Sequence, residues 1–245
     1  MRDTTDNKFA CHDAPPMSTM RRRTVLALAA AAAMTQLTRA PHAGAQDPGR
    51  DAALIRAAER GNAAEVQALL AQGASVRARD ASGRTALVAA TYGNRVEAAR
   101  VLIAAGADVN AQDDLRNSAF LLAGARGYLE IVRMTLGAGA DLRSTNRFGG
   151  TALIPACHYG HVETVRELLA TKIDVDHVNN LGWTALLEAV ILGDGGPTHT
   201  EIVRLLLAAK ANPNIADAQG VTPLAHARNR GYTTMAKLIE GAGRR

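Results

Sequence analysis

Aromatic residues and cysteines are scarce in this chain of 245 residues. Aromatic side chains make up 3% of it, and its two cysteines are Cys11 and Cys157. Two cysteines exclude a disulfide-dense scaffold and any metal site that needs four cysteine ligands. Apolar residues nevertheless make up 47% of the sequence, which is enough for one elongated core or one to two compact domains. The composition therefore predicts a folded protein rather than a disordered one.

Sequence motifs of catalysis are also missing beyond residue 45. That part of the sequence contains no serine nucleophile elbow, no His-Glu-x-x-His zinc motif, no phosphate-binding loop and no paired-cysteine motif. Gly195-Gly196 lies in a predicted turn, but without the Lys and the Ser or Thr of a phosphate-binding loop. The sequence accordingly predicts a non-enzymatic protein with no catalytic residues, no cofactor and no metal.

The amino-terminal region has the pattern of an export signal. Three arginines, Arg21 to Arg23, precede ten uncharged apolar residues that run from Val25 to Met34. A membrane-spanning helix needs about 20 such residues, whereas ten is typical of the central part of a signal peptide. Ala43-Gly44-Ala45 has the small-x-small pattern of a cleavage site. We expect residues 1–45 to be a signal peptide that is cut after Ala45.

The export route is left open by the sequence. Arg22-Arg23-Thr24-Val25-Leu26 partly resembles a twin-arginine signal, which directs folded proteins to export. The general secretion route is the other possibility, and an alanine-rich buried helix with a basic start is the alternative to export. A cleaved signal of either kind predicts a bacterial protein that is periplasmic or secreted and has no membrane association after cleavage.

Much of the net positive charge lies in the predicted signal. The whole chain has 28 Lys and Arg against 23 Asp and Glu, and residues 1–45 hold six of the basic and three of the acidic ones. The remainder carries 22 against 20, a balance that does not favour nucleic-acid binding. A nucleic-acid-binding face would have to use Arg77, Arg79, Arg84, Arg116, Arg143 and Arg147. Cleavage would also leave Cys157 without a disulfide partner in the chain.

A repeat of constant period organises the rest of the sequence. Its landmarks are the evenly spaced Thr85-Ala86-Leu87, Ser118-Ala119-Phe120, Thr151-Ala152-Leu153 and Thr184-Ala185-Leu186, with a degenerate Ala52-Ala53-Leu54 one period before the first. The period, about 33 residues, indicates a repeat architecture. The last landmark, Thr222-Pro223-Leu224, comes five positions later than the period requires. These five extra residues fall in the segment 193–200, which we predict to be a surface loop, either recruited for binding or merely tolerated.

Each repeat unit has the signals of two short helices joined by a reversal. The Thr or Ser can cap the first helix through its hydroxyl, and the Leu or Phe two residues later recurs as its buried residue. Gly127, Gly160, Gly193 and Gly231 stand where the first helix must stop in the left-handed conformation, and Asn94 takes this role in the second unit. Because neither helix pair could bury its apolar side alone, neighbouring units must stack.

The sequence resembles the ankyrin repeat family, on Gly83-Arg84-Thr85-Ala86-Leu87, Val96-Glu97 and Gly106-Ala107-Asp108-Val109-Asn110 above all. The resemblance covers residues 47–245 and implies an all-α repeat solenoid of helix-turn-helix units and β-turns with polar caps. We expect an ankyrin repeat domain over residues 46–245, in units near 47–80, 81–113, 114–146, 147–179, 180–217 and 218–245. The family binds other proteins through the β-turn tips and the exposed side of the first helices.

The few aromatic residues beyond position 45 point to a contact surface. Four of the seven, Tyr92, Phe148, Tyr159 and Trp183, stand at predicted turn tips or just before the helix reversal. Such residues dominate protein interfaces, although Trp183 and Phe148 could instead fold over the neighbouring turn. The predicted partner-binding residues are Tyr92, Arg126, Arg147, Phe148, His158, Tyr159, Leu181, Trp183, Ile191 and Leu192.

The sequence thus predicts an exported monomer that binds a folded protein of unidentified kind in an accessory, protective or inhibitory role. The alternative is a small-ligand or metal-dependent activity at His158, Tyr159, Asp194 and His199 beside the insertion, with His199 in a loop. His158 and His161 are three residues apart, a spacing that could suggest a metal site. Gly160 between them should break the helix that would align the two rings. The resemblance also implies another role for His161, because ankyrin repeats usually have a histidine at this place that ties adjacent turns. Cys157 is predicted to be a buried, inert thiol.

Overall fold

The computed structural model describes residues 47–243, and the expected signal peptide lies outside the described residues. The described part contains twelve helices in six antiparallel pairs and no strand. The pairs are α1 (Pro48–Arg60) with α2 (Ala63–Ala71), α3 (Ala86–Tyr92) with α4 (Val96–Ala104), α5 (Ala119–Arg126) with α6 (Leu129–Gly137), α7 (Leu153–His158) with α8 (Val162–Leu169), α9 (Ala185–Ile191) with α10 (Pro197–Ala208), and α11 (Pro223–Asn229) with α12 (Thr233–Ala242).

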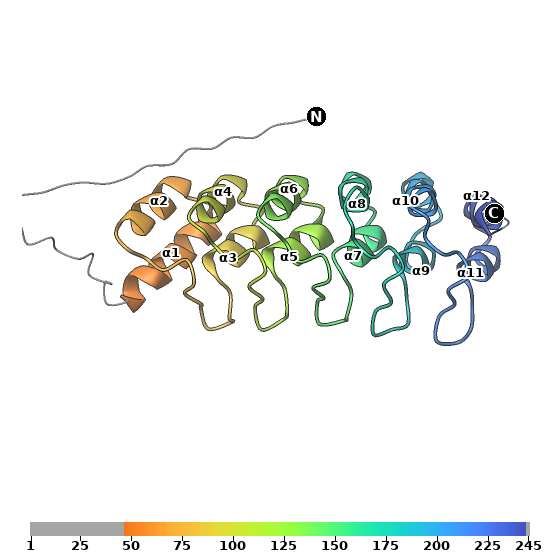
Figure 1. Cartoon of the computed structure of the whole chain (residues 1–245), viewed down its shortest axis with the longest axis horizontal. Helices are drawn as coiled ribbons and strands as arrows, with labels where there is room; N and C mark the ends of the chain where they lie inside the picture. The colour runs from red at the N-terminus through yellow and green to blue at the C-terminus, as the bar shows by residue number, and fades with distance from the viewer. Residues whose placement is uncertain (1–46, 244–245) are drawn as a thin grey trace, which may run out of the picture. The chain divides into compact units, whose positions relative to one another are not determined.

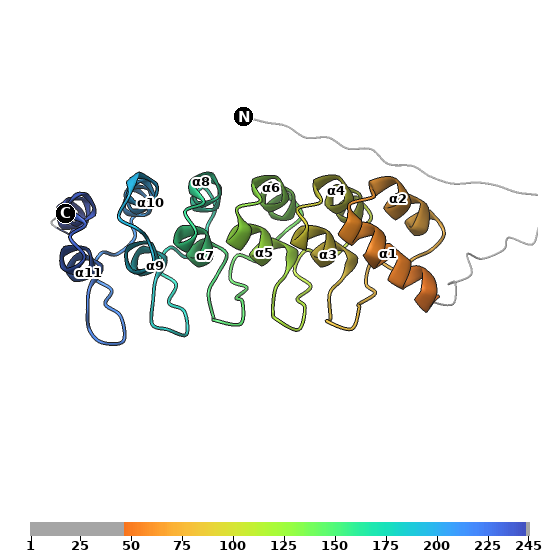
Figure 2. The same ribbon diagram turned by 180° about the vertical axis from the view of Figure 1, so that it is seen from behind.

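The helix pairs of this part stack in two rows, as expected for the solenoid. The first helices of the pairs, α1 to α11 in odd numbers, form one row, and the second helices form the other (Figure 1). The long loops between pairs project together on the side of the first helices, and the view from behind shows the same arrangement (Figure 2). Each pair packs mainly against its two neighbours in sequence.

The core runs along the row and is built from the repeat landmarks. Leu87, Phe120, Leu153 and Leu186 are fully or almost fully buried at the same place in four successive first helices. Ile131 and Val165 bury the facing side of the second helices. Since each apolar side is covered by the next pair, the core is shared between neighbours and not enclosed within one unit.

Hydroxyl caps begin four of the first helices, as the sequence predicts. The capping residues are Thr85, Ser118, Thr184 and Thr222, and each accepts a hydrogen bond from the backbone N–H three residues on. The exception is Thr151, whose buried hydroxyl makes no hydrogen bond, and α7 begins only at Leu153. Pro155 explains the difference, because it has no N–H to donate to the carbonyl of Thr151, as residues at that place do in the other four repeats.

The helix reversals are left-handed where expected in four repeats. Gly127, Gly160 and Gly231 have φ values of 69°, 77° and 72°, and Asn94 has a φ of 52°. The prediction for Gly193 was wrong, since the positive φ at that reversal belongs to Gly195. At Gly193 a side chain is excluded for another reason, because an added Cβ would collide with the carbonyl oxygen of Ala189.

The repeat-five insertion is only partly a loop. Helix α10 begins at Pro197 and has 12 residues, so the last four residues of the segment 193–200 are helical. The prediction that His199 lies in a loop was therefore wrong. Pro197 stands in the first turn of the helix, where the absent N–H of proline costs no hydrogen bond. None of the helices described is long and apolar enough to cross a membrane.

Candidate protein-binding surface

The loops between helix pairs are held by one recurring hydrogen-bond pattern. An Asp or Asn at the start of each turn accepts hydrogen bonds from the backbone N–H groups two and four residues on; these residues are Asp80, Asp113, Asn146, Asn179 and Asp217. The bonds at Asn146 measure 2.9 Å to Phe148 and 3.1 Å to Gly150. Because this residue and the backbone hold the turn, the side chain at the tip is free to serve recognition.

Three successive tips carry large exposed apolar side chains at the same position. Leu115, Phe148 and Leu181 are 48%, 53% and 52% exposed and follow one another at the period of the repeat. We call these three residues the tip stripe. The backbone N–H of Asn180 donates to the carbonyl of Phe148 at 3.0 Å, which joins two of the tips directly. The corresponding tip residues of the second and sixth units, Ser82 and Gln219, are polar.

Two arginines without ion pairs accompany the tip stripe. Arg116 adopts a positive φ of 59° at the tip of the third unit. The guanidinium of Arg147 lies 4.7 Å from the ring centre of Phe148. Both side chains are exposed and neither forms an ion pair within residues 47–243. The stripe is therefore apolar with two cationic neighbours, and the exposed Asp114 beside Leu115 adds one acidic neighbour.

The predicted residues before the helix reversals differ in exposure. Tyr159 is 60% exposed, and its ring stacks on that of His158 with 4.2 Å between the ring centres. Leu192 and Arg126 are also exposed. Tyr92, His158 and Ile191 are half-buried, and so is Trp183, which belongs to a predicted turn tip. The predicted set therefore divides into side chains that a partner can reach directly and side chains that support them.

Tyr92 belongs to the second class, because its hydroxyl is engaged within the domain. The hydroxyl donates to Asp113 at 2.8 Å and accepts from the amide of Asn117 at 3.0 Å. Burial and the hydrogen bond to Asp113 raise the pKa of Tyr92. The tyrosine thus joins the second helix pair to the following turn.

The alternative site around His158 is a buried polar contact between the fourth and fifth helix pairs. Glu188 on α9 is 6% exposed, accepts a hydrogen bond from Asn179 at 3.0 Å, and lies 3.5 Å from Nδ1 of His158. Burial raises the pKa of Glu188 to about 7. Burial and the neighbouring His199 lower the pKa of His158. Within residues 47–243 no three His, Cys, Asp or Glu side chains are arranged to hold a metal ion.

Cys157 is fully buried beside this contact. Burial, and then the charge of Glu188, raise the pKa of the thiol well above its usual value. A thiol that stays protonated and inaccessible is a poor nucleophile. The geometry agrees with a packing role for Cys157.

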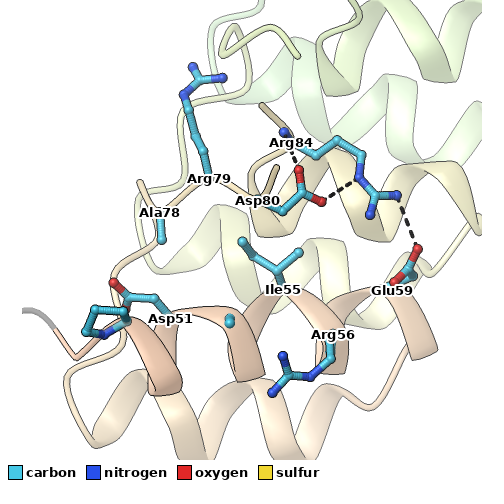
Figure 3. A pocket seen from close by; sticks show the side chains of 10 residues that line it. Asp51, Ile55, Arg56, Glu59, Ala78, Arg79, Asp80 and Arg84 are labelled. Carbon is cyan, nitrogen blue, oxygen red and sulfur yellow. Dashed lines mark hydrogen bonds and ion pairs between the residues drawn. The ribbon is translucent and has the colours of Figure 1, made fainter. Parts of the chain in front are cut away.

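Two hollows lie elsewhere in the domain. One, of about 510 Å³, separates α1 from the first turn; Arg84 there bonds Asp80 at 2.7 Å and Glu59 at 3.2 Å (Figure 3). The other, of about 500 Å³, lies beside the insertion between Gly196, Arg204 and Thr234. None of the four residues of the alternative ligand site lines this second hollow.

The predicted set of partner-binding residues omits several exposed residues of the surface. Leu115 and Val178 are as exposed as the selected residues, and Arg116 stands beside Leu115. The repeat period that links Leu115 to Phe148 and Leu181 was the available signal. Glu188 carried no such signal, because its burial depends on Asn179 and His158 from two other segments.

Comparisons with known proteins place the chain among ankyrin repeats. A family model described as ankyrin repeats (3 copies) matches residues 24–113 and 120–217. YahD of Escherichia coli strain K12, named as a putative ankyrin repeat protein, is 46% identical over 56 residues, which cover 23% of this chain and 28% of YahD. The aligned part thus spans less than a third of that relative.

Two crystal structures are similar over most of the chain. An ankyrin repeat domain from Acinetobacter baumannii AYE is 57% identical, with a TM-score of 0.76, and the match covers 78% of this chain and 97% of that domain. EF0377, an ankyrin repeat protein, is 37% identical with a TM-score of 0.76, over 80% of this chain and 98% of its own.

Proposed function

The chain belongs to the ankyrin repeat family, and from this premise we propose that its repeat domain binds a folded partner protein through the tip stripe. Ankyrin repeats are generally protein–protein interaction modules, and the family is generally non-enzymatic. Tyr159 and Leu192, which are exposed at the ends of α7 and α9, extend the proposed surface. The domain acts as a monomer that presents one preformed face.

The observation that carries the proposal is the exposure of Leu115, Phe148 and Leu181 at equivalent places. Burying a Leu or Phe side chain stabilises a protein by about 1.5–3 kcal/mol. The three exposed side chains do not contribute this free energy to folding, and the turns that carry them do not need an apolar residue at the tip. Because the Asp and Asn hydrogen bonds already hold the turns, a partner meets a rigid surface and little ordering cost opposes binding.

The chemistry of the surface indicates the kind of partner. Arg116 and Arg147, which form no ion pair within residues 47–243, bring two positive charges to the edge of the apolar stripe, against the single negative charge of Asp114. A complementary partner has an apolar ridge flanked by Asp or Glu side chains, since matched charges speed association and reject wrong partners. The proposed partner is therefore a folded protein with an acidic, apolar patch.

The amino-terminal pattern supports an exported location for this binding. A signal peptide over residues 1–45 would bring the repeat domain to the periplasm or outside the cell, where the partner would be another exported protein. Protection, delivery or inhibition of that protein are the roles that such a rigid binding domain can serve.

Crosslinking and capture from periplasmic extract test the proposal. The double variant Phe148→Ala with Leu181→Ala should keep the unfolding midpoint within a few degrees of the wild type and lose the stoichiometric partner. The matched control, Arg133→Ala with Arg166→Ala, changes two exposed residues on the second helices and should retain it. Binding of the identified, purified partner should then weaken at least tenfold in the tip variant and fall with added salt. Equal capture by a stably folded tip variant would overturn the proposal.

A further inference from the structure

Several successive helix pairs are tied by a residue at, or close to, the start of the second helix. Arg95 donates to the carbonyl of Glu59 at 3.1 Å, and the ring of His161 donates to the backbone of Ala125. His199 places Nε2 at 2.9 Å from the carbonyl oxygen of His158. Each bond reaches from one pair to the end of the first helix in the preceding pair. His199 keeps this place because the five extra residues all precede it.

His199 differs from His161 in having a second acceptor supplied by the insertion. Its Nδ1 lies 2.9 Å from Oδ1 of Asp194, and the same oxygen accepts a hydrogen bond from the N–H of Gly196 at 2.9 Å. A carbonyl and an ionised carboxylate can only accept hydrogen bonds. Both contacts of His199 are hydrogen bonds at once only when the imidazole carries a proton on each nitrogen.

We propose that the repeat-five insertion is a proton-responsive clamp in which doubly protonated His199 holds Asp194 and the fourth helix pair together. A neutral ring has one N–H to donate. Deprotonation therefore breaks the hydrogen bond of His199 either to the carboxylate of Asp194 or to the carbonyl of His158. The segment 193–196 is then held by one hydrogen bond fewer. A second bond holds the start of the insertion to the sixth helix pair and does not involve His199: the hydroxyl of Tyr232 donates to the carbonyl of Gly193 at 3.1 Å.

The charged surroundings of His199 agree with a cation at this position. Asp194 is exposed, and the N–H of Gly196 followed by the bond to His199 lowers its pKa. From α7, the ring of His158 faces His199, and burial and His199 lower its pKa. Glu188 on α9 lies behind His158. Arg166 on α8 pairs with Glu163 and Glu201, and Arg204 on α10 pairs with Glu201, so neither arginine pairs with Asp194.

The clamp lies beside the proposed binding surface, and its effect on binding rests on the proposed function. His158 and Tyr159 stand at one end of the clamped contact, and Leu192 immediately precedes the insertion. Loosening of the segment at higher pH would raise the entropy cost of ordering this end of the surface. Partner affinity should therefore decrease as His199 loses its proton.

Thermal unfolding of the free domain at pH 5.5 and pH 8.5 tests the clamp without any partner. An ordinary histidine is mostly protonated at the first pH and mostly neutral at the second, since imidazole titrates near about 6.5. Asp194→Asn removes the charge and keeps an acceptor oxygen. It should lower the melting temperature by about 2 °C at pH 5.5 and by less than half as much at pH 8.5.

His161→Gln is the matched control, because it removes the titratable group, but not the capacity to donate, from the equivalent tie in a repeat without the insertion. Burial lowers the pKa of His161, so this variant should cost no more stability at pH 5.5 than at pH 8.5. Repeating the Asp194→Asn comparison in a Glu188→Gln background subtracts the titration of Glu188. A cost of Asp194→Asn that is absent, or equal at both pH values, overturns the clamp. That outcome leaves partner capture by the tip stripe untouched.

Discussion

At the scale of single residues, Glu188 is the group whose environment departs most from that of a solvated carboxylate. Its side chain is buried between two helix pairs, and its nearest possible cation is a histidine 3.5 Å away whose own pKa is lowered. The folded protein therefore keeps a proton on Glu188 up to about pH 7, whereas an unfolded chain releases it near about 4.3. Over that interval the native state binds more protons, so stability falls as the pH rises.

Glu188→Gln should remove this dependence. Glutamine can still accept the hydrogen bond from Asn179 and carries no charge. We expect the free energy of unfolding to rise by about 1–3 kcal/mol at pH 8 and to change by less than about 0.5 kcal/mol at pH 5. Urea unfolding at the two pH values measures both quantities. Glu163→Gln, which changes an exposed glutamate on α8, is the control and should have little effect at either pH. A gain of equal size at pH 5 and pH 8 would contradict burial of an ionisable carboxyl.

At the scale of the helix, the fourth pair departs from its neighbours at the first turn of α7. Thr184 and Thr151 hold the same place in the repeat, yet Thr184 accepts a bond from the N–H of Leu187 at 3.2 Å and Thr151 has no partner. The proline at 155 prevents the first backbone bond of α7, so the turn does not close over the Thr151 hydroxyl. One residue therefore changes both the length and the capping of a helix.

Replacing each threonine by the isosteric valine should separate a working cap from an idle hydroxyl. Thr184→Val loses a capping bond and leaves the N–H of Leu187 unsatisfied, so it should cost about 1–2 kcal/mol. Thr151→Val removes a buried polar atom that has no partner and should be neutral or stabilising. Urea denaturation of the two variants gives the comparison. Equal losses would mean that Thr151 caps its helix in solution.

At the scale of the whole repeat domain, stability is a chain of contacts between neighbours. Each helix pair of residues 47–243 packs mainly on the next, and no extensive contact joins the first pair to the last. The second helices add a surface series of ion pairs, of which Arg133 with Glu130 and Glu167 is an example. Exposed pairs contribute little, so the buried interfaces between pairs hold the array together.

Weakening one interior interface should divide the array. Leu153→Ala removes a fully buried side chain in the fourth pair and should cost about 2–5 kcal/mol. Repeats couple only to their neighbours, so the two sides of the weakened interface should unfold at different denaturant concentrations. The unfolding curve followed by the fluorescence of Trp183, the only tryptophan, should then no longer coincide with the curve followed by the helical circular dichroism of all pairs. The wild type provides the reference curves. Superimposable curves for the variant would show that the array unfolds as one unit despite the cavity.

Local features of the sequence were sufficient to predict much of this architecture. The hydroxyl caps at Thr85 and Ser118 and the left-handed Gly127 depend on neighbours within one repeat. The buried Phe120 could be recognised because apolar residues recur at its place with the period of the repeat. The errors at Gly193 and His199 arose where the insertion interrupts that period. There, neither spacing nor propensity shows where the next helix begins, because Pro197 can start a helix as readily as it can end a loop.

The sequence by itself determined the family, the helix pairs and the positions of the turns, since a repeat encodes its contacts at fixed separations. Only the tertiary structure decided which side chains a partner can reach and which are engaged. Trp183 and Tyr92 are of the residue types that are common in protein interfaces, but both are half-buried. Leu115, which the argument from aromatic residues did not select, is exposed. The contacts of Glu188 and of His199 with His158 likewise arise from segments that meet only after neighbouring pairs have stacked.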